Sequence, residues 1–183
     1  MEKQSTRISL LFLIAGAIVW LGAVNIRAII GYELLQPHVL EFLPNLDKEF
    51  EREIFHLISY SSLLIIGGYA VTFLSAVVFM ATTSLEVKKH GWLLMSAILF
   101  FMFSPVEMYT LYLDGRMAFL ELFTNPDLME LRQLFVHRIA ALAGVPLIAL
   151  LSYYTIIGLA VWKPLRKTEN RAESQMAPKA TGV

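Results

Sequence analysis

Ionisable and hydrogen-bonding side chains lie within or beside the long apolar segments of this chain. They are Arg27, His56, Tyr60, Glu107, Asp114, His137 and Arg138. An ionisable group at the centre of a bilayer costs at least about 2.5–3.5 kcal/mol, so residues of this kind commonly mark a functional site. An arginine that forms charge-assisted hydrogen bonds with a carboxylate offsets much of that cost. We therefore predict a polar ligand-binding site in which Arg27 or Arg138 pairs with Glu107.

The spacing of these residues places some of them on common helix faces. Glu107 and Asp114 are seven residues apart, which is close to two helical turns. His56 and Tyr60 are four residues apart and also share a face. A structural role is the alternative, because charged side chains near a helix end can extend to the interface and fix packing there. That alternative applies most to Asp114, which follows the last residue of its apolar segment.

A pair of histidines supports a second interpretation, a redox protein linked to haem or to a quinone. His56 and His137 begin different apolar segments at similar depth, as two axial ligands of a b-type haem would. Both histidines lie at the ends of their segments, which argues against haem because the iron would lie near the water interface. His38 and His90 complete no second site, and a hydrogen-bonded histidine is an ordinary alternative. We keep haem as the alternative and expect no cofactor otherwise.

Several classes of chemistry have no signal in the sequence. The chain contains no cysteine, which excludes disulfides, thiolate metal sites and cysteine nucleophiles. It has no zinc-protease motif, no phosphate-binding glycine loop and no serine in a nucleophile-elbow context. Lys+Arg and Asp+Glu both number 15, so no net charge favours a nucleic acid. These observations favour a binding or accessory protein over an enzyme.

Four apolar segments must position the polar residues. Hydrophobic residues make up 57% of the chain and charged residues 16%, against about 45–50% and 25% in soluble domains. The segments cover residues 8–31, 54–81, 91–113 and 135–162, and a helix needs about 20 residues to cross a bilayer. Within one short spanning segment, only a helix forms all the hydrogen bonds that its own backbone N–H and C=O groups need in lipid. We predict an all-α, integral membrane four-helix bundle over residues 1–167.

The positive charges predict the orientation of these segments. Lys and Arg dominate the N-terminus, the connection near Lys88 and Lys89, and the flank from Lys163 to Arg171, whereas acidic residues dilute them in the other two connections. This bias favours both termini in the cytoplasm. We expect a multi-pass protein of the bacterial inner membrane, with the bilayer and a small ligand or other membrane subunits as partners. The polar tail of residues 168–183 is predicted to be disordered.

The two outer connections resemble each other. Each is about twenty residues long and is predicted to contain a turn and a short amphipathic helix that leads directly into the next span. Adding 81 to a position carries Phe42 to Phe123 and His56 to His137. A duplicated hairpin explains this match, and so does the common composition of outer loops; the sequence leaves both open.

Prolines and small residues indicate kinks and close contacts inside the bundle. Pro105 and Pro146 are predicted to kink the third and fourth spans. Small residues in spans are typical of close helix contacts. The glycines concerned are Gly16, Gly22, Gly67, Gly68 and Gly144.

Overall fold

The computed structural model describes residues 4–36, 41–83, 90–124 and 126–164. In chain order these residues form α1 (Gln4–Tyr32), α2 (Lys48–Thr82), α3 (Gly91–Phe123), α4 (Leu128–Ala140), the short 3-10 helix η1 (Ala141–Gly144) and α5 (Val145–Trp162). Helices α4 and α5 with η1 between them make one tract, so four tracts are long and apolar enough to cross a membrane. The all-helical, four-span prediction is confirmed to that extent. The predicted tail of residues 168–183 lies outside the described residues.

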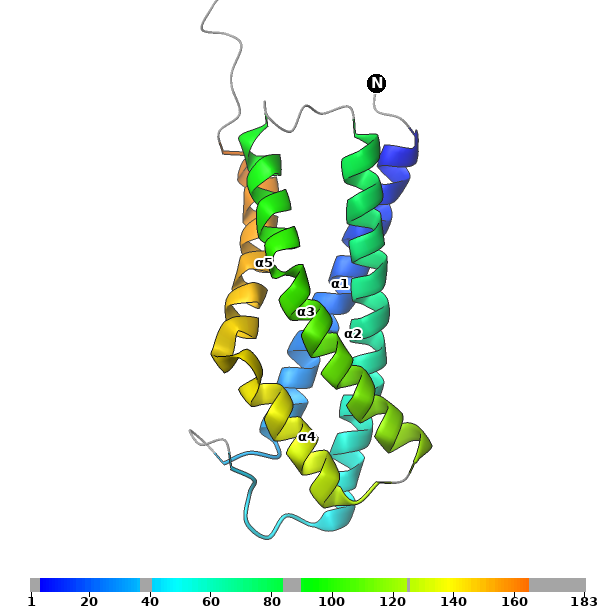
Figure 1. Cartoon of the computed structure of the whole chain (residues 1–183), viewed down its shortest axis with the longest axis vertical. Coiled ribbons are helices and arrows are strands. Elements are labelled where there is room, and N and C mark those ends of the chain that lie inside the picture. Colours follow the sequence, from blue (N-terminus) through cyan, green and yellow to red (C-terminus); the bar gives the residue numbers. More distant parts are fainter. Residues whose placement is uncertain (1–3, 37–40, 84–89, 125, 165–183) are drawn as a thin grey trace, which may run out of the picture.

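The helices extend beyond the apolar segments at one end of the bundle. Helix α2 begins at Lys48, before the predicted boundary at residue 54, and α3 continues to Phe123, beyond the predicted boundary at residue 113. The predicted amphipathic segments are the first turns of α2 and α4. The predicted boundaries lie where charged residues lower the hydropathy. Several of those charged residues form ion pairs between helices, so the helices continue through them. Figure 1 shows this end opposite the start of α1, and we call it the loop end.

Helices α1 and α2 approach most closely at two glycines. A Cβ atom on Gly68 would lie 2.7 Å from the backbone nitrogen of Trp20, and one on Gly16 would lie 2.7 Å from the hydroxyl of Thr72. Gly22 and Gly67 face open space, with nothing within 4 Å of an added Cβ. Two of the four predicted packing glycines in these helices therefore lie at the contact.

The fourth span is broken, whereas the third is continuous. Leu142, Ala143 and Gly144 have φ values of 57°, 47° and 86°, which end α4 and redirect the chain into α5. Pro146 lies in the first turn of α5, where its missing N–H costs no helical hydrogen bond. Pro105 lies inside α3, and Figure 1 shows that helix changing direction near its middle.

Two apolar clusters fill the bundle. The cluster at the loop end includes Leu34, Phe55, Ile58, Met117, Leu131 and Phe135. The second cluster includes Trp20, Ile65, Tyr69, Ala149 and Tyr153. The first connection folds onto the loop-end cluster through an antiparallel bridge between Leu35 and Phe42. Residues from all four spans thus hold the polar groups of α3 at fixed positions.

Candidate functional site

Helix α3 carries three buried carboxylates at a constant spacing. Glu107, Asp114 and Glu121 are seven residues apart, about 10 Å along the helix for each step. They are 8%, 0% and 8% exposed, and all three lie on one face of α3. We call them the α3 carboxylates. Each has partners from a different set of helices, so the row runs from the middle of the bundle to the loop end.

Glu107 is bound by tryptophan. The Nε1 atom of Trp20 donates a hydrogen bond to Oε1 of Glu107 at 3.0 Å. The indole ring packs edge-on between Tyr69 and Tyr153, with ring centroids 4.8 and 4.7 Å away. The predicted pairing of Glu107 with Arg27 or Arg138 is therefore corrected. Both arginines instead bind the next carboxylate along α3.

Asp114 joins three helices. Arg27 of α1 forms an ion pair with Oδ2, and Nε of Arg138 of α4 donates to Oδ1 at 2.9 Å. The Asp114 side chain is fully buried, and those of Arg27 and Arg138 are 8% and 21% exposed. The structural position of Asp114 corrects the expectation that it ends its span, because α3 continues past it. Trp20 and Arg27 are also seven residues apart, so α1 presents Trp20 to Glu107 and Arg27 to Asp114.

A second buried ion pair connects the first turns of α2 and α4. Nε and Nη2 of Arg132 donate to the two oxygens of Glu51 at 2.5 and 2.7 Å. Glu51 is fully buried, and the guanidinium of Arg132 also lies over the ring of Phe42, 5.0 Å from its centroid. We did not predict this pair, although 81 residues separate its members, the same offset that relates the two outer connections. Duplication and common loop composition both stay open as explanations of that offset.

We expect Glu51 and Arg132 to be energetically coupled. A double-mutant cycle of Glu51→Gln and Arg132→Gln should give a coupling free energy of about 1–2 kcal/mol. This is low for a bidentate ion pair, because the side chain of Arg132 is one-third exposed and solvent weakens the attraction. Thermal and denaturant unfolding in mild detergent would measure it. Additive effects of the two changes would remove the pair from the forces that hold α2 against α4.

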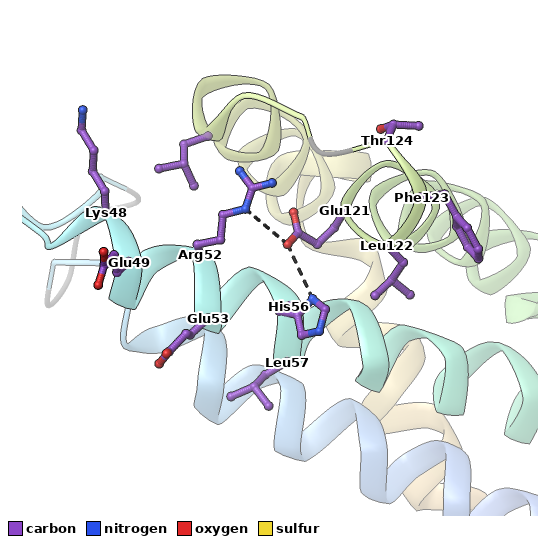
Figure 2. A pocket seen from close by; sticks show the side chains of 11 residues that line it. Lys48, Glu49, Arg52, Glu53, His56, Leu57, Glu121, Leu122, Phe123 and Thr124 are labelled. Carbon is purple, nitrogen blue, oxygen red and sulfur yellow. Dashed lines mark ion pairs between the residues drawn. The ribbon is translucent and has the colours of Figure 1, made fainter.

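Glu121 lines an open groove at the loop end. The groove has a volume of about 1130 Å³ and lies between the start of α2 and the end of α3. It is lined by Lys48, Glu49, Arg52, Glu53, His56, Leu57, Glu121, Leu122, Phe123, Thr124 and Leu128. We call it the outer groove. Figure 2 shows Arg52 and His56 of α2 pointing across it toward Glu121 of α3.

The carboxylate of Glu121 is buried but incompletely paired. Nε of Arg52 and Nδ1 of His56 each lie 3.6 Å from its Oε1 atom. Its Oε2 atom is buried and has no hydrogen-bond partner within the described part of the chain. Arg52 also donates to the carbonyl oxygen of Pro126 at 2.9 Å, which ties the groove to the connection before α4. An extension of the seven-residue step from Glu107 and Asp114 would have identified Glu121 in the sequence.

The structure brings together only some of the predicted site residues. Arg27, Asp114 and Arg138 form one network, with Glu107 one step away along α3. His56 lies in the outer groove, where the ring of Tyr60 packs edge-on against it at 4.8 Å. These groups therefore form two sites rather than the single one predicted.

His137 lies apart from His56. Its Nε2 atom is 3.5 Å from the hydroxyl of Tyr109, whereas His56 contacts Glu121. Those two contact points on α3 are twelve residues apart, about 18 Å along the helix axis. The arrangement gives no support to the pair as two ligands of one iron. Among the described residues, no group of three or more His, Asp or Glu side chains is placed to hold a metal ion.

No known protein family, curated protein or solved structure matches this chain, so its own geometry is the guide to its function.

Proposed function

We propose that the chain is a small multi-pass membrane protein that binds a ligand or partner through the outer groove and catalyses no reaction. We place it in a bacterial inner membrane, and the distribution of Lys and Arg favours both termini in the cytoplasm, so the loop end and its groove face outward. The observation that carries the proposal is the buried Oε2 atom of Glu121, which lines the groove and has no hydrogen-bond partner among the described residues.

The other polar groups of α3 have a different role in this proposal. Both oxygens of Asp114 are bound by arginines, and Glu107 is bound by Trp20. These interactions join α1, α3 and α4 and leave Asp114 little capacity for a ligand. They support a fixed scaffold on which the end of α3 presents Glu121.

Glu121 retains capacity for a donor. A buried oxygen without a hydrogen bond costs about 1–3 kcal/mol, which a ligand N–H or O–H group would recover on reaching it. The side chain of His56 is 48% exposed, so it can move aside without disturbing the apolar core, whereas Arg52 is held by Pro126 as well as by Glu121. A site of this kind binds without needing a nucleophile or a general base.

Copurification tests the proposal. The protein would be purified in mild detergent as wild type, as Glu121→Gln and as Glu130→Gln, a matched change at an exposed residue near the loop end that does not line the groove. Mass spectrometry of the extracted small molecules and lipids should find a species enriched with the wild type and with Glu130→Gln. Its amount should fall about tenfold with Glu121→Gln, as expected for a loss of about 1.4 kcal/mol.

The thermal unfolding of the three proteins would first establish that each is folded. An identical set of bound molecules in folded wild-type and Glu121→Gln protein would overturn the outer groove as the binding site.

A further inference from the structure

We infer that the outer groove binds the headgroup of a zwitterionic phospholipid in which a primary ammonium stands beside a phosphate. The inference rests on the proposed function and names the ligand class of the same groove. It follows from a column of basic side chains on α2, from the carboxylate of Glu121 on α3 across the groove, and from the apolar surface at its edge.

One wall is a column of basic side chains on α2. Lys48, Arg52 and His56 are spaced four residues apart, so they follow one another along one helix face. Arginine and lysine are the side chains that bind phosphate most often, and arginine can do so through two parallel hydrogen bonds. Because Arg52 already donates to Pro126 and lies beside Glu121, the exposed ammonium of Lys48 offers the main place for the phosphate of a headgroup in this column.

The opposite wall supplies the partner for an ammonium group. Glu121 of α3 lies across from Arg52 and His56 (Figure 2). Its Oε2 atom has no hydrogen-bond partner among the residues that the structure describes, and it accepts but cannot donate. Glu49 and Glu53 also line the groove as exposed carboxylates, but they belong to α2, so Glu121 is the carboxylate that α3 contributes. A primary ammonium has three N–H donors and can bond to Oε2. A choline group has none, and a glycerol headgroup has no positive charge.

Apolar residues at the groove favour a lipid over a free phosphoamine. Leu57 and Phe123 line the groove and are 53% and 74% exposed. The exposed apolar surface continues along α2 at Leu63 and Leu64, which are 48% and 57% exposed. In a membrane-spanning α2 this surface faces the hydrocarbon of the bilayer, so the acyl chains of a lipid whose headgroup lies in the groove would run along it without leaving the membrane.

Lipid titration tests the inference. The delipidated full-length protein in detergent would receive phosphatidylethanolamine, phosphatidylcholine or phosphatidylglycerol with the same acyl chains, and native mass spectrometry would measure the bound lipid. We expect phosphatidylethanolamine to bind at least about tenfold more tightly than the other two. The preference should disappear in Glu121→Gln and persist in Glu130→Gln. Lys48→Gln, a change at an exposed residue, should weaken the binding of phosphatidylethanolamine in a protein whose fold is unaffected.

The remaining outcomes separate this inference from the proposed function. Equal binding of the three lipids, or a preference for phosphatidylglycerol, would overturn the inference. Competition by free phosphoethanolamine at the affinity of the lipid would overturn the lipid as the source of the headgroup. If a different molecule copurifies and is lost with Glu121→Gln, the inference fails and the proposed function stands. If Glu121→Gln changes no bound molecule at all, both fail.

Discussion

Asp114→Asn should lower the free energy of unfolding of the bundle by about 3–5 kcal/mol, the usual effect of removing one partner from a buried ion pair. Asp114 is fully buried and contacts two guanidinium groups, those of Arg27 and Arg138. Asparagine keeps the size of the side chain but leaves two positive charges close together with no negative charge between them. Denaturant and thermal unfolding in mild detergent, followed by circular dichroism, would measure the loss.

Two further variants make this result specific. Asp127→Asn, at the exposed N-cap of α4, makes the same chemical change at a position where either residue caps a helix well, so its effect should stay within about 0.5 kcal/mol. Adding Arg138→Gln to Asp114→Asn should recover part of the lost stability, because it removes one of the two positive charges that repel each other. If Asp114→Asn and Asp127→Asn unfold at the same temperature and denaturant concentration, the ion pairs of Asp114 with Arg27 and Arg138 do not hold the helices together.

The sequence allowed the number and type of the helices to be predicted, because four long apolar segments admit no other structure in a bilayer. It misplaced their boundaries at the loop end. Residues such as Glu51 and Asp114 end an apolar segment when only hydropathy is considered, yet each is fully buried against an arginine of another helix. A charge that has a buried partner does not end a helix, and hydropathy contains no information about that partner.

Part of the site could also be predicted. The seven-residue step between Glu107 and Asp114 follows from helix geometry, and the same step reaches Glu121. The partners could not be assigned, because they depend on how each helix is rotated and how far it is shifted along its neighbours. The pairing of Trp20 with Glu107 and of Arg27 with Asp114 is one such register, and Gly16 and Gly68 help to set it by allowing α1 to lie close to α2.

The second prediction concerns that register. Gly68→Ala should destabilise the bundle by about 2–3 kcal/mol, the upper part of the usual range for overpacking. The new methyl group would lie 2.7 Å from the backbone nitrogen of Trp20 and 3.0 Å from its Cα atom. Backbone cannot move aside as a flexible side chain can, so α1 must shift away from α2. That shift would also move the indole of Trp20 relative to α3 and weaken its hydrogen bond to Glu107.

The adjacent glycine is a matched control. An added Cβ on Gly67 meets nothing within 4 Å, so Gly67→Ala should be neutral or stabilising by up to about 1 kcal/mol, since alanine favours a helix more than glycine does. Both variants make the same change in the same helix, one residue apart, and thermal unfolding in one detergent compares them directly. Equal stability of Gly67→Ala and Gly68→Ala would show that α1 and α2 are not held at the close distance on which the positions of Trp20 and Arg27 depend. A loss confined to Gly68→Ala would support that register, because only this methyl group lies between the two helices.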